Sequence, residues 1–211
     1  MTYTPEEFFE YLQTKIENEY ANSNLTNGKD IHITPNYAIC DTPIQKGKDI
    51  IAGLNWGDIS KGKQTCYPKA DKDRNWRFLK SSEQYFIQYL GINLSKLAHV
   101  NYTNLCFFRT KKLSHLTETD WEISLPLFQE YVNYINPPRI LILGTSVIDI
   151  VKKYCNAENH LSHKVTENKT TAKGYNLEIC GIKTYCVPHP QARISSIARD
   201  EIWQRVFEEQ P

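Results

Sequence analysis

Three polar residues that could take part in catalysis, Asn55, Asn104 and His189, each follow a short apolar stretch of the sequence. Such stretches are typical of buried strands, and ligands bind at the carboxyl ends of parallel strands in open α/β sheets. An asparagine carboxamide carries both a donor and an acceptor, and a neutral histidine can donate a hydrogen bond to a departing oxygen. Together these side chains could position a water molecule and stabilise a leaving group.

The first of these residues lies in a short loop that is flanked by glycines. The sequence Ile50-Ile51-Ala52 leads into Gly53-Leu54-Asn55-Trp56-Gly57-Asp58, and glycine lets the backbone approach a ligand where a Cβ atom would clash. The alternative is a tight turn in which Asn55 binds its own backbone. Asp58 could be a general base, or it could simply form a turn after Gly57.

A basic segment follows this loop. Residues 61–80 hold seven basic residues against two acidic ones, with Tyr67, Trp76 and Phe78 interleaved; the basic residues are Lys61, Lys63, Lys69, Lys72, Arg74, Arg77 and Lys80. Basic charge mixed with aromatic rings can bind a phosphate backbone and stack on bases. A solvated surface loop is the alternative reading of the same pattern.

Helices and strands alternate along the sequence. We expect a helix from Thr4, with Phe8, Leu12, Ile16 and Tyr20 along one face, and further helices over 81–90 (stopped by Gly91), 124–135, from 144 to 154, and after a cap at Ser195 or Ser196. Strands are expected over 48–53, 97–105 and 139–143, with a hairpin over 177–187, whereas 156–173 reads as a polar loop. This order predicts an α/β fold, a three-layer α/β/α sandwich around a four-stranded, mainly parallel sheet.

Composition indicates an ordinary soluble globular protein. The chain has 211 residues, 40% hydrophobic residues and a formal net charge of +1, which suits one domain over 1–211, with a helix and an irregular lead-in over 1–47. The N-terminus has neither part of a signal peptide, so we expect a cytoplasmic protein with reduced cysteines. None of the six cysteines forms a C-x-x-C pair, which argues against a structural zinc or iron–sulfur site.

The ordered set of segments resembles the uracil-DNA glycosylase superfamily, in the branch with Asn in its first motif. Gly53-Leu54-Asn55-Trp56-Gly57 resembles the loop that holds the catalytic water, and His189-Pro190-Gln191-Ala192-Arg193 resembles the His-Pro-Ser type loop. Between them, Tyr102-Thr103-Asn104-Leu105 resembles the strand whose Asn reads the base. Residues 135–144 resemble the helix, proline turn, strand and Gly-x-Ser/Ala helix start of the family. The resemblance spans about residues 48 to 207.

The resemblance implies a role for each matching residue. Asn55 would position the water and His189 would stabilise the leaving base, while Asn104 would read the edge of a base flipped out of the helix. Trp76, Phe78 or Tyr67 would stack on that base, and the rest of its pocket would come from Gly53, Leu54, Trp56, Gly57 and Asp58. Phosphate contacts would come from Gln191, Arg193, Lys61, Lys63 and Arg74.

Two residues depart from the family pattern. Trp56 replaces the usual proline and Gln191 replaces the usual serine, so base choice or activity could differ. We therefore expect a monomeric DNA glycosylase, without metal or cofactor and without membrane attachment, that acts on uracil or a related deaminated base in DNA. Two alternatives stay open: an inactive relative that binds nucleic acid or a modified base, and a hydrolase of small nucleosides.

Overall fold

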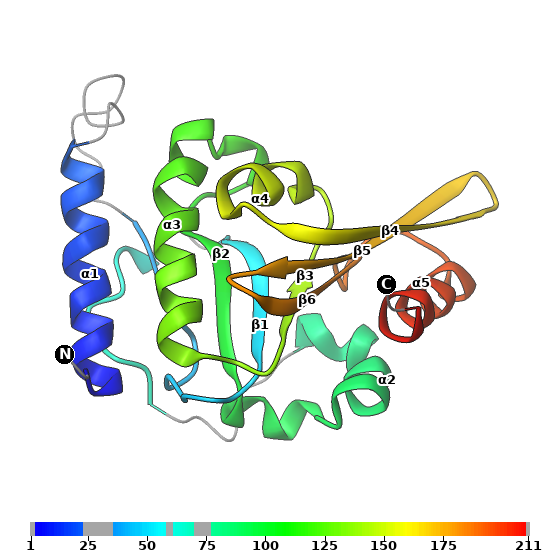
Figure 1. Ribbon diagram of the computed structural model, residues 1–211, viewed down its shortest axis with the longest axis horizontal. Coiled ribbons are helices and arrows are strands. Elements are labelled where there is room, and N and C mark those ends of the chain that lie inside the picture. Colours follow the sequence, from blue (N-terminus) through cyan, green and yellow to red (C-terminus); the bar gives the residue numbers. More distant parts are fainter. Residues whose placement is uncertain (1–2, 23–35, 58–60, 70–76, 210–211) are drawn as a thin grey trace.

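The computed structural model describes residues 3–22, 36–57, 61–69 and 77–209. Its centre is a six-stranded mixed sheet with the strand order β2-β1-β3-β6-β5-β4, and helices cover both of its faces (Figure 1). The strands are β1 (Ile50–Trp56), β2 (Asn101–Arg109), β3 (Ile140–Leu143), β4 (Glu158–Glu167), β5 (Thr170–Ile179) and β6 (Ile182–Val187). The expected α/β architecture with helices on both faces of the sheet is therefore present.

The expected strand count is wrong. Strands β2, β1, β3 and β6 are parallel neighbours, and the antiparallel hairpin β4–β5 extends this sheet beyond β6. Much of the segment 156–173, which was expected to be a loop, forms that hairpin. Its side chains that face the helix layer include His163, Ala172, Gly174 and Asn176, which are polar or small, so the apolar alternation that marks a half-buried strand is weak.

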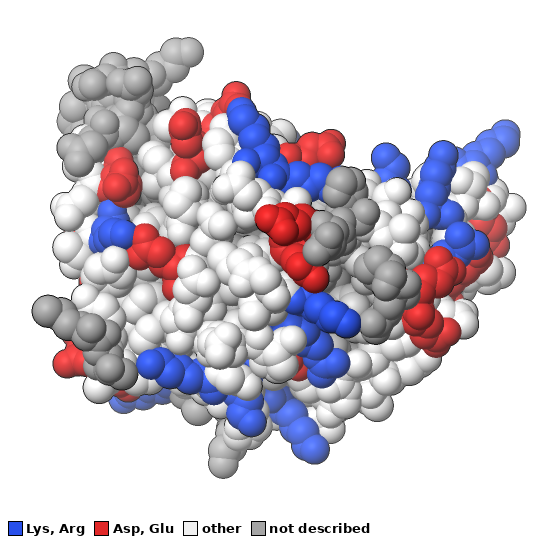
Figure 2. Space-filling model, in the orientation of Figure 1, with Lys and Arg blue, Asp and Glu red and all other residues white. Residues whose placement is uncertain are grey.

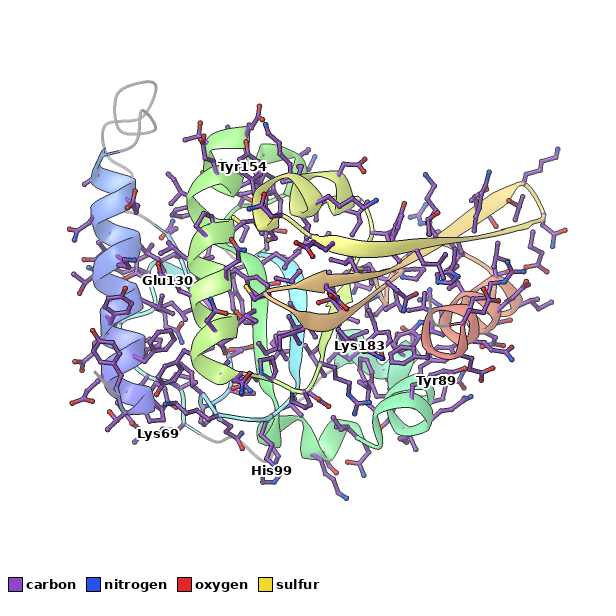
Figure 3. The ribbon with its side chains drawn as sticks, in the orientation of Figure 1. Lys69, Tyr89, His99, Glu130, Tyr154 and Lys183 are labelled. Carbon is purple, nitrogen blue, oxygen red and sulfur yellow. The ribbon has the colours of Figure 1, made fainter. Side chains whose placement is uncertain are left out.

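One face of the sheet is covered by α3 (Glu118–Ile135) and α4 (Ile148–Cys155), and α1 (Pro5–Asn22) lies against α3. The first helix begins as expected, because the Thr4 and Glu7 side chains cap each other's backbone N–H groups. Glu130 of α3, labelled in Figure 3, points toward α1, where its carboxylate accepts hydrogen bonds from Tyr11 (2.9 Å) and Lys15 (2.5 Å).

The other face is covered by α5 (Ser196–Glu208) and by a short helical segment made of a 3-10 turn (Arg77–Ser82), α2 (Glu83–Tyr85) and a π turn (Phe86–Leu90). The expected stop is confirmed, because Gly91 caps this segment with a φ of +69°. Trp203 of α5 is fully buried and stacks on Tyr85, with ring centroids 4.8 Å apart, and on Tyr89, labelled in Figure 3. The aromatic contacts join the two elements into one layer.

Several element boundaries differ from the expectation. Strand β1 extends to Trp56, so Leu54 and Asn55, which were expected in a loop after the strand, lie within it. Helix α3 starts at Glu118, earlier than expected, because Thr117 and Asp120 form a capping box there. Strand β2 starts at Asn101, later than expected, because a 3-10 helix occupies Leu94–His99; another, Leu113–His115, follows β2. Asn101 is fully buried, and its carboxamide holds the turn before β1 through the carbonyls of Gln45 and Lys48.

All six cysteines are free thiols. Within the described residues, no helix has the length and apolar character needed to cross a bilayer, and no group of three His, Cys, Asp or Glu side chains could hold a metal ion.

Candidate functional site

One cavity of about 500 Å³ opens at the carboxyl edge of the parallel strands, a size within the usual range for small-ligand sites. The side chains of Asn55, Asn104 and His189 all line it. Residues far apart in the sequence, from the end of β1, the interior of β2 and the loop after β6, therefore share one pocket. Asn104 was expected to follow its strand, but it lies within β2. Its wall is completed by Asp41, Gly53, Leu54, Trp56, Gly57, Lys61, Tyr102, Arg109, Leu113 and Ser146.

Asn55 is held in one orientation by the end of β2. Its Nδ2 donates to the carbonyl oxygen of Thr110 (3.2 Å) and to the Thr110 hydroxyl (2.8 Å), and that hydroxyl in turn donates to the carbonyl of Lys112 (2.9 Å). Because the Thr110 carbonyl can only accept, the amide group of Asn55 must face it. The Asn55 Oδ1 atom then has no partner among the described residues and is free to accept a hydrogen bond from a molecule in the cavity.

A break in strand pairing places Trp56 beside Asn55. The β1–β2 register shifts between Asn55 and Trp56, and such bulges redirect side chains next to functional sites. Trp56 is 9% exposed, and its ring meets Tyr102 edge-on with centroids 6.5 Å apart. The guanidinium of Arg109 lies 5.6 Å from the centre of the Trp56 ring. Two aromatic rings and a cation therefore form one side of the pocket.

Asn104 is 4% exposed, and no hydrogen bond joins its carboxamide to any residue that the structure describes. It faces Gly53 in the β1–β2 ladder. A Cβ atom on Gly53 would lie 2.2 Å from Asn104 Oδ1, so only glycine leaves room for this carboxamide. The carboxamide can therefore offer both a donor and an acceptor to a molecule in the cavity.

His189 follows β6 in the loop that leads to α5. Its Nδ1 accepts a hydrogen bond from the backbone N–H of Gln191 (3.1 Å), so the proton of a neutral ring sits on Nε2. Burial lowers the pKa of His189, and the nearby Arg199 guanidinium lowers it further. The ring is therefore neutral at pH 7 and presents an Nε2–H donor.

The backbone of the His189 loop is fixed from two sides. Arg199 of α5 is 8% exposed and donates to the carbonyls of His189 (3.3 Å) and Ala192 (2.8 Å). Ser81, from the 3-10 turn before α2, donates to the carbonyl of Pro190 (2.9 Å). These contacts hold the imidazole in place without using its ring nitrogens.

The pocket also contains polar residues that the sequence analysis did not select. Asp41 contributes a half-buried carboxylate from the irregular segment before β1, where its backbone N–H donates to the carbonyl of Tyr102 (2.9 Å). Arg109 and Ser146 line the same cavity. No motif marks Asp41 or Arg109, whereas Ser146 ends the Gly144-Thr145-Ser146 helix start that belongs to the resemblance. For Tyr102, the signal was its position two residues before Asn104, which puts both side chains on one face of β2.

Only some of the other residues that the sequence analysis proposed for the site lie at this pocket. Leu54, Trp56, Gly53, Gly57 and Lys61 line it, whereas Gln191 and Arg193 are exposed in the His189 loop. Lys63 pairs with Glu17 of α1 (3.0 Å) instead. Asp58, Arg74 and Trp76 lie outside the described residues; Phe78 lies on the 3-10 turn, and its side chain is also outside them.

Tyr67 was expected to be a possible base-stacking residue, and the structure contradicts this. Its ring packs edge-on against Phe9 of α1, with centroids 5.5 Å apart, and its hydroxyl accepts a hydrogen bond from the backbone N–H of Ile44 (2.6 Å). Tyr67 is part of the contact between α1 and the lead-in segment. The aromatic rings that do line the cavity are Trp56 and Tyr102.

No protein-family model matches this sequence, and no curated protein matches it either.

Proposed function

We propose that this protein is a DNA glycosylase that hydrolyses the N-glycosidic bond of uracil or a related deaminated base. The observation that carries the proposal is the shared cavity, in which Asn55, His189 and the unpartnered carboxamide of Asn104 meet. The cavity is large enough for an extruded base even though Trp56 occupies the place where the resemblance expects proline.

The side chains of Asn55, His189 and Asn104 each have the orientation or protonation state that this reaction needs. The free Oδ1 of Asn55 accepts a hydrogen bond from a water molecule and orients it toward the sugar, since Thr110 holds the amide group. The Nε2–H group of neutral His189 donates to the base oxygen on which negative charge grows as the bond breaks. Asn104 pairs with an adjacent acceptor and donor on the base edge, a pattern that separates uracil from cytosine.

Two further parts of the cavity suit an oxocarbenium-like transition state. Asp41 supplies a carboxylate, which stabilises positive charge on the sugar or accepts a proton from the attacking water. Trp56 and Tyr102 supply aromatic surface for stacking. None of these residues requires a metal or a cofactor for its role.

The proposal is tested with oligonucleotides that carry uracil, hypoxanthine, xanthine or hydroxymethyluracil, by measuring free base and abasic sites. We expect release of at least one base, and a loss of about 100-fold or more in Asn55→Ala and in His189→Ala, the size of effect seen when a positioned catalytic group is removed. Asp41→Asn is expected to slow release without weakening DNA binding.

Intact substrates in every reaction would refute the enzymatic proposal. Tight binding without base release would favour a protein that binds a modified base, and release from free nucleosides but not from DNA would favour a small-nucleoside hydrolase.

A further inference from the structure

The β4–β5 hairpin extends beyond the end of β6. Strand β5 pairs with β6 only from Tyr175 onward, whereas five residue pairs, from His163 with Gly174 to Glu167 with Thr170, belong to β4 and β5 alone. At about 3.3 Å per residue, this overhang extends roughly 15 Å past the sheet. It projects from the carboxyl edge, the edge where the cavity opens, as the yellow and orange arm of Figure 1.

The two faces of the overhang differ in character. The inner face packs on α5, where Val165 and Ala172 join the core and Glu167 hydrogen-bonds the Ser195 hydroxyl. The outer face and the turn carry lysines and uncharged polar residues and no acidic residue. The exposed residues there are Lys164, Thr166, Asn168, Lys169, Thr171 and Lys173. In Figure 2, basic side chains gather along this arm.

The lysines sit in positions that are unfavourable for the isolated protein. Lys164 lies directly opposite Lys173 in the ladder, and like charges at facing positions repel. Lys169 has a φ of +66° in the hairpin turn, a conformation that glycine adopts at lower cost. No ion pair joins any of these three amines to the residues that the structure describes. A bound polyanion would offset both costs.

The basic face and the edge of the cavity are linked through α4. Ser146, at the cavity wall, precedes α4, and Lys152 of α4 lies 5.4 Å from the ring centre of Tyr175 at the base of the overhang. Asp149 of α4 is the acidic residue near this ring. A strand of DNA that leaves the cavity mouth can follow this side of α4 onto the hairpin.

We propose that the outer face of the β4–β5 overhang binds the phosphate backbone of DNA that flanks the cavity, through Lys164, Lys169 and Lys173. The proposal rests on the proposed function for the choice of DNA as the polyanion. It adds a binding surface that lies outside the pocket, and it predicts contacts that do not depend on base sequence.

The test compares DNA binding by the full chain and by the triple variant Lys164→Ser, Lys169→Ser and Lys173→Ser. A matched control replaces Lys48, Lys96 and Lys183 by Ser, and all three lysines are exposed. They lie before or at the start of β1, β2 and β6, which is the edge of the sheet opposite to the cavity and the overhang. Lys183 is labelled in Figure 3. The probe is a labelled 20-base-pair duplex without any deaminated base, titrated at several salt concentrations.

We expect the hairpin variant to bind at least about tenfold more weakly, with a salt slope reduced by about 2 to 3, as the loss of three phosphate contacts requires. The control is expected to stay within about twofold of the unaltered protein. Equal affinity and slope for the hairpin variant, an equal loss in the control, or binding to phosphatidylglycerol vesicles instead of the duplex would overturn the proposal.

The two proposals fail separately. Hairpin-dependent binding of the duplex without any base release would refute only the glycosylase proposal. If the hairpin variant binds DNA normally and still releases the base, only the hairpin proposal is refuted. If such a variant also aggregates at high concentration, the lysines instead protect an exposed sheet edge from pairing with another copy.

Discussion

Gly53 and Asn104 occupy facing positions in β1 and β2, and this contact allows a direct test of the base-reading role that we propose for Asn104. A Cβ atom at position 53 would displace the Asn104 carboxamide, so we expect Gly53→Ala to reduce base release about 10- to 100-fold, or about 1.4 to 2.7 kcal/mol of transition-state stabilisation. The measurement is kcat/KM on the best deaminated-base substrate.

Gly57→Ala is the matched control for this substitution. Gly57 lies four residues further along, also at the cavity, but nothing lies within 4 Å of a Cβ atom placed there. We expect Gly57→Ala to keep at least half of the activity. Equal effects of both substitutions would show that the loss at position 53 does not come from Asn104.

The charge state of His189 predicts how activity depends on pH. Its pKa is lowered from 6.5 by burial and by Arg199, so the neutral donor predominates at pH 6.5 and above and is lost as pH falls through the lowered pKa. Protonation also places a second donor against the Gln191 N–H and removes that hydrogen bond. Single-turnover base release should therefore be flat from pH 7 to 8 and decline only below pH 6.5.

Arg199 provides the control for the pH profile. Arg199→Gln removes the positive charge that lowers the pKa of His189, so the acidic limb should move to higher pH, whereas Arg199→Lys keeps the charge and should leave the limb in place. A loss of activity that is the same at every pH in both variants would mean that Arg199 acts only through the loop carbonyls that it holds.

At the level of elements, α5 connects the His189 loop to the hairpin. Gly174 of β5 lies so close to α5 that an added Cβ would sit 2.4 Å from Val206 and 3.1 Å from Ile202. We expect Gly174→Ala to lower the free energy of unfolding by about 1 to 3 kcal/mol, the cost of overpacking a filled core. Denaturant unfolding measures it. Lys173→Ala, on the exposed face one residue away, should change stability by less than about 0.5 kcal/mol.

Elements with strong local signals could be predicted from the sequence, and those without them could not. The apolar stretch of β3 and the Thr4 cap of α1 were found because each is specified by neighbouring residues. Strand β4 was missed because its buried face includes His163, which is satisfied by Asn176 of β5 (2.6 Å) and lies 3.3 Å from a Glu209 carboxylate oxygen. That environment exists only after the tertiary structure has formed.

At the scale of the whole molecule, the sequence analysis identified pocket residues on or after the strands better than it identified the residues that complete the pocket wall. Asn55 and His189 could be selected because parallel strands bring their carboxyl ends together. Asn104 was selected on the same ground, although it lies inside β2 and reaches the cavity from there. Asp41 could not, because it precedes β1 in a segment without regular structure and reaches the pocket only by pairing beside β2. Sequence order therefore predicted the catalytic candidates, while the shape of the pocket depended on packing.

The position of Trp56 gives the protein an internal optical reporter. Trp56 lines the cavity and is 9% exposed, whereas Trp121 and Trp203, 3% and 0% exposed, are not among the residues that line the cavity. A nucleobase that enters the cavity would stack near the Trp56 indole and quench its fluorescence. Titration with unlabelled DNA should therefore dim the emission of the unaltered chain, and the change should be much smaller in Trp56→Phe, so that base entry can be timed in a stopped-flow instrument apart from the chemistry that follows.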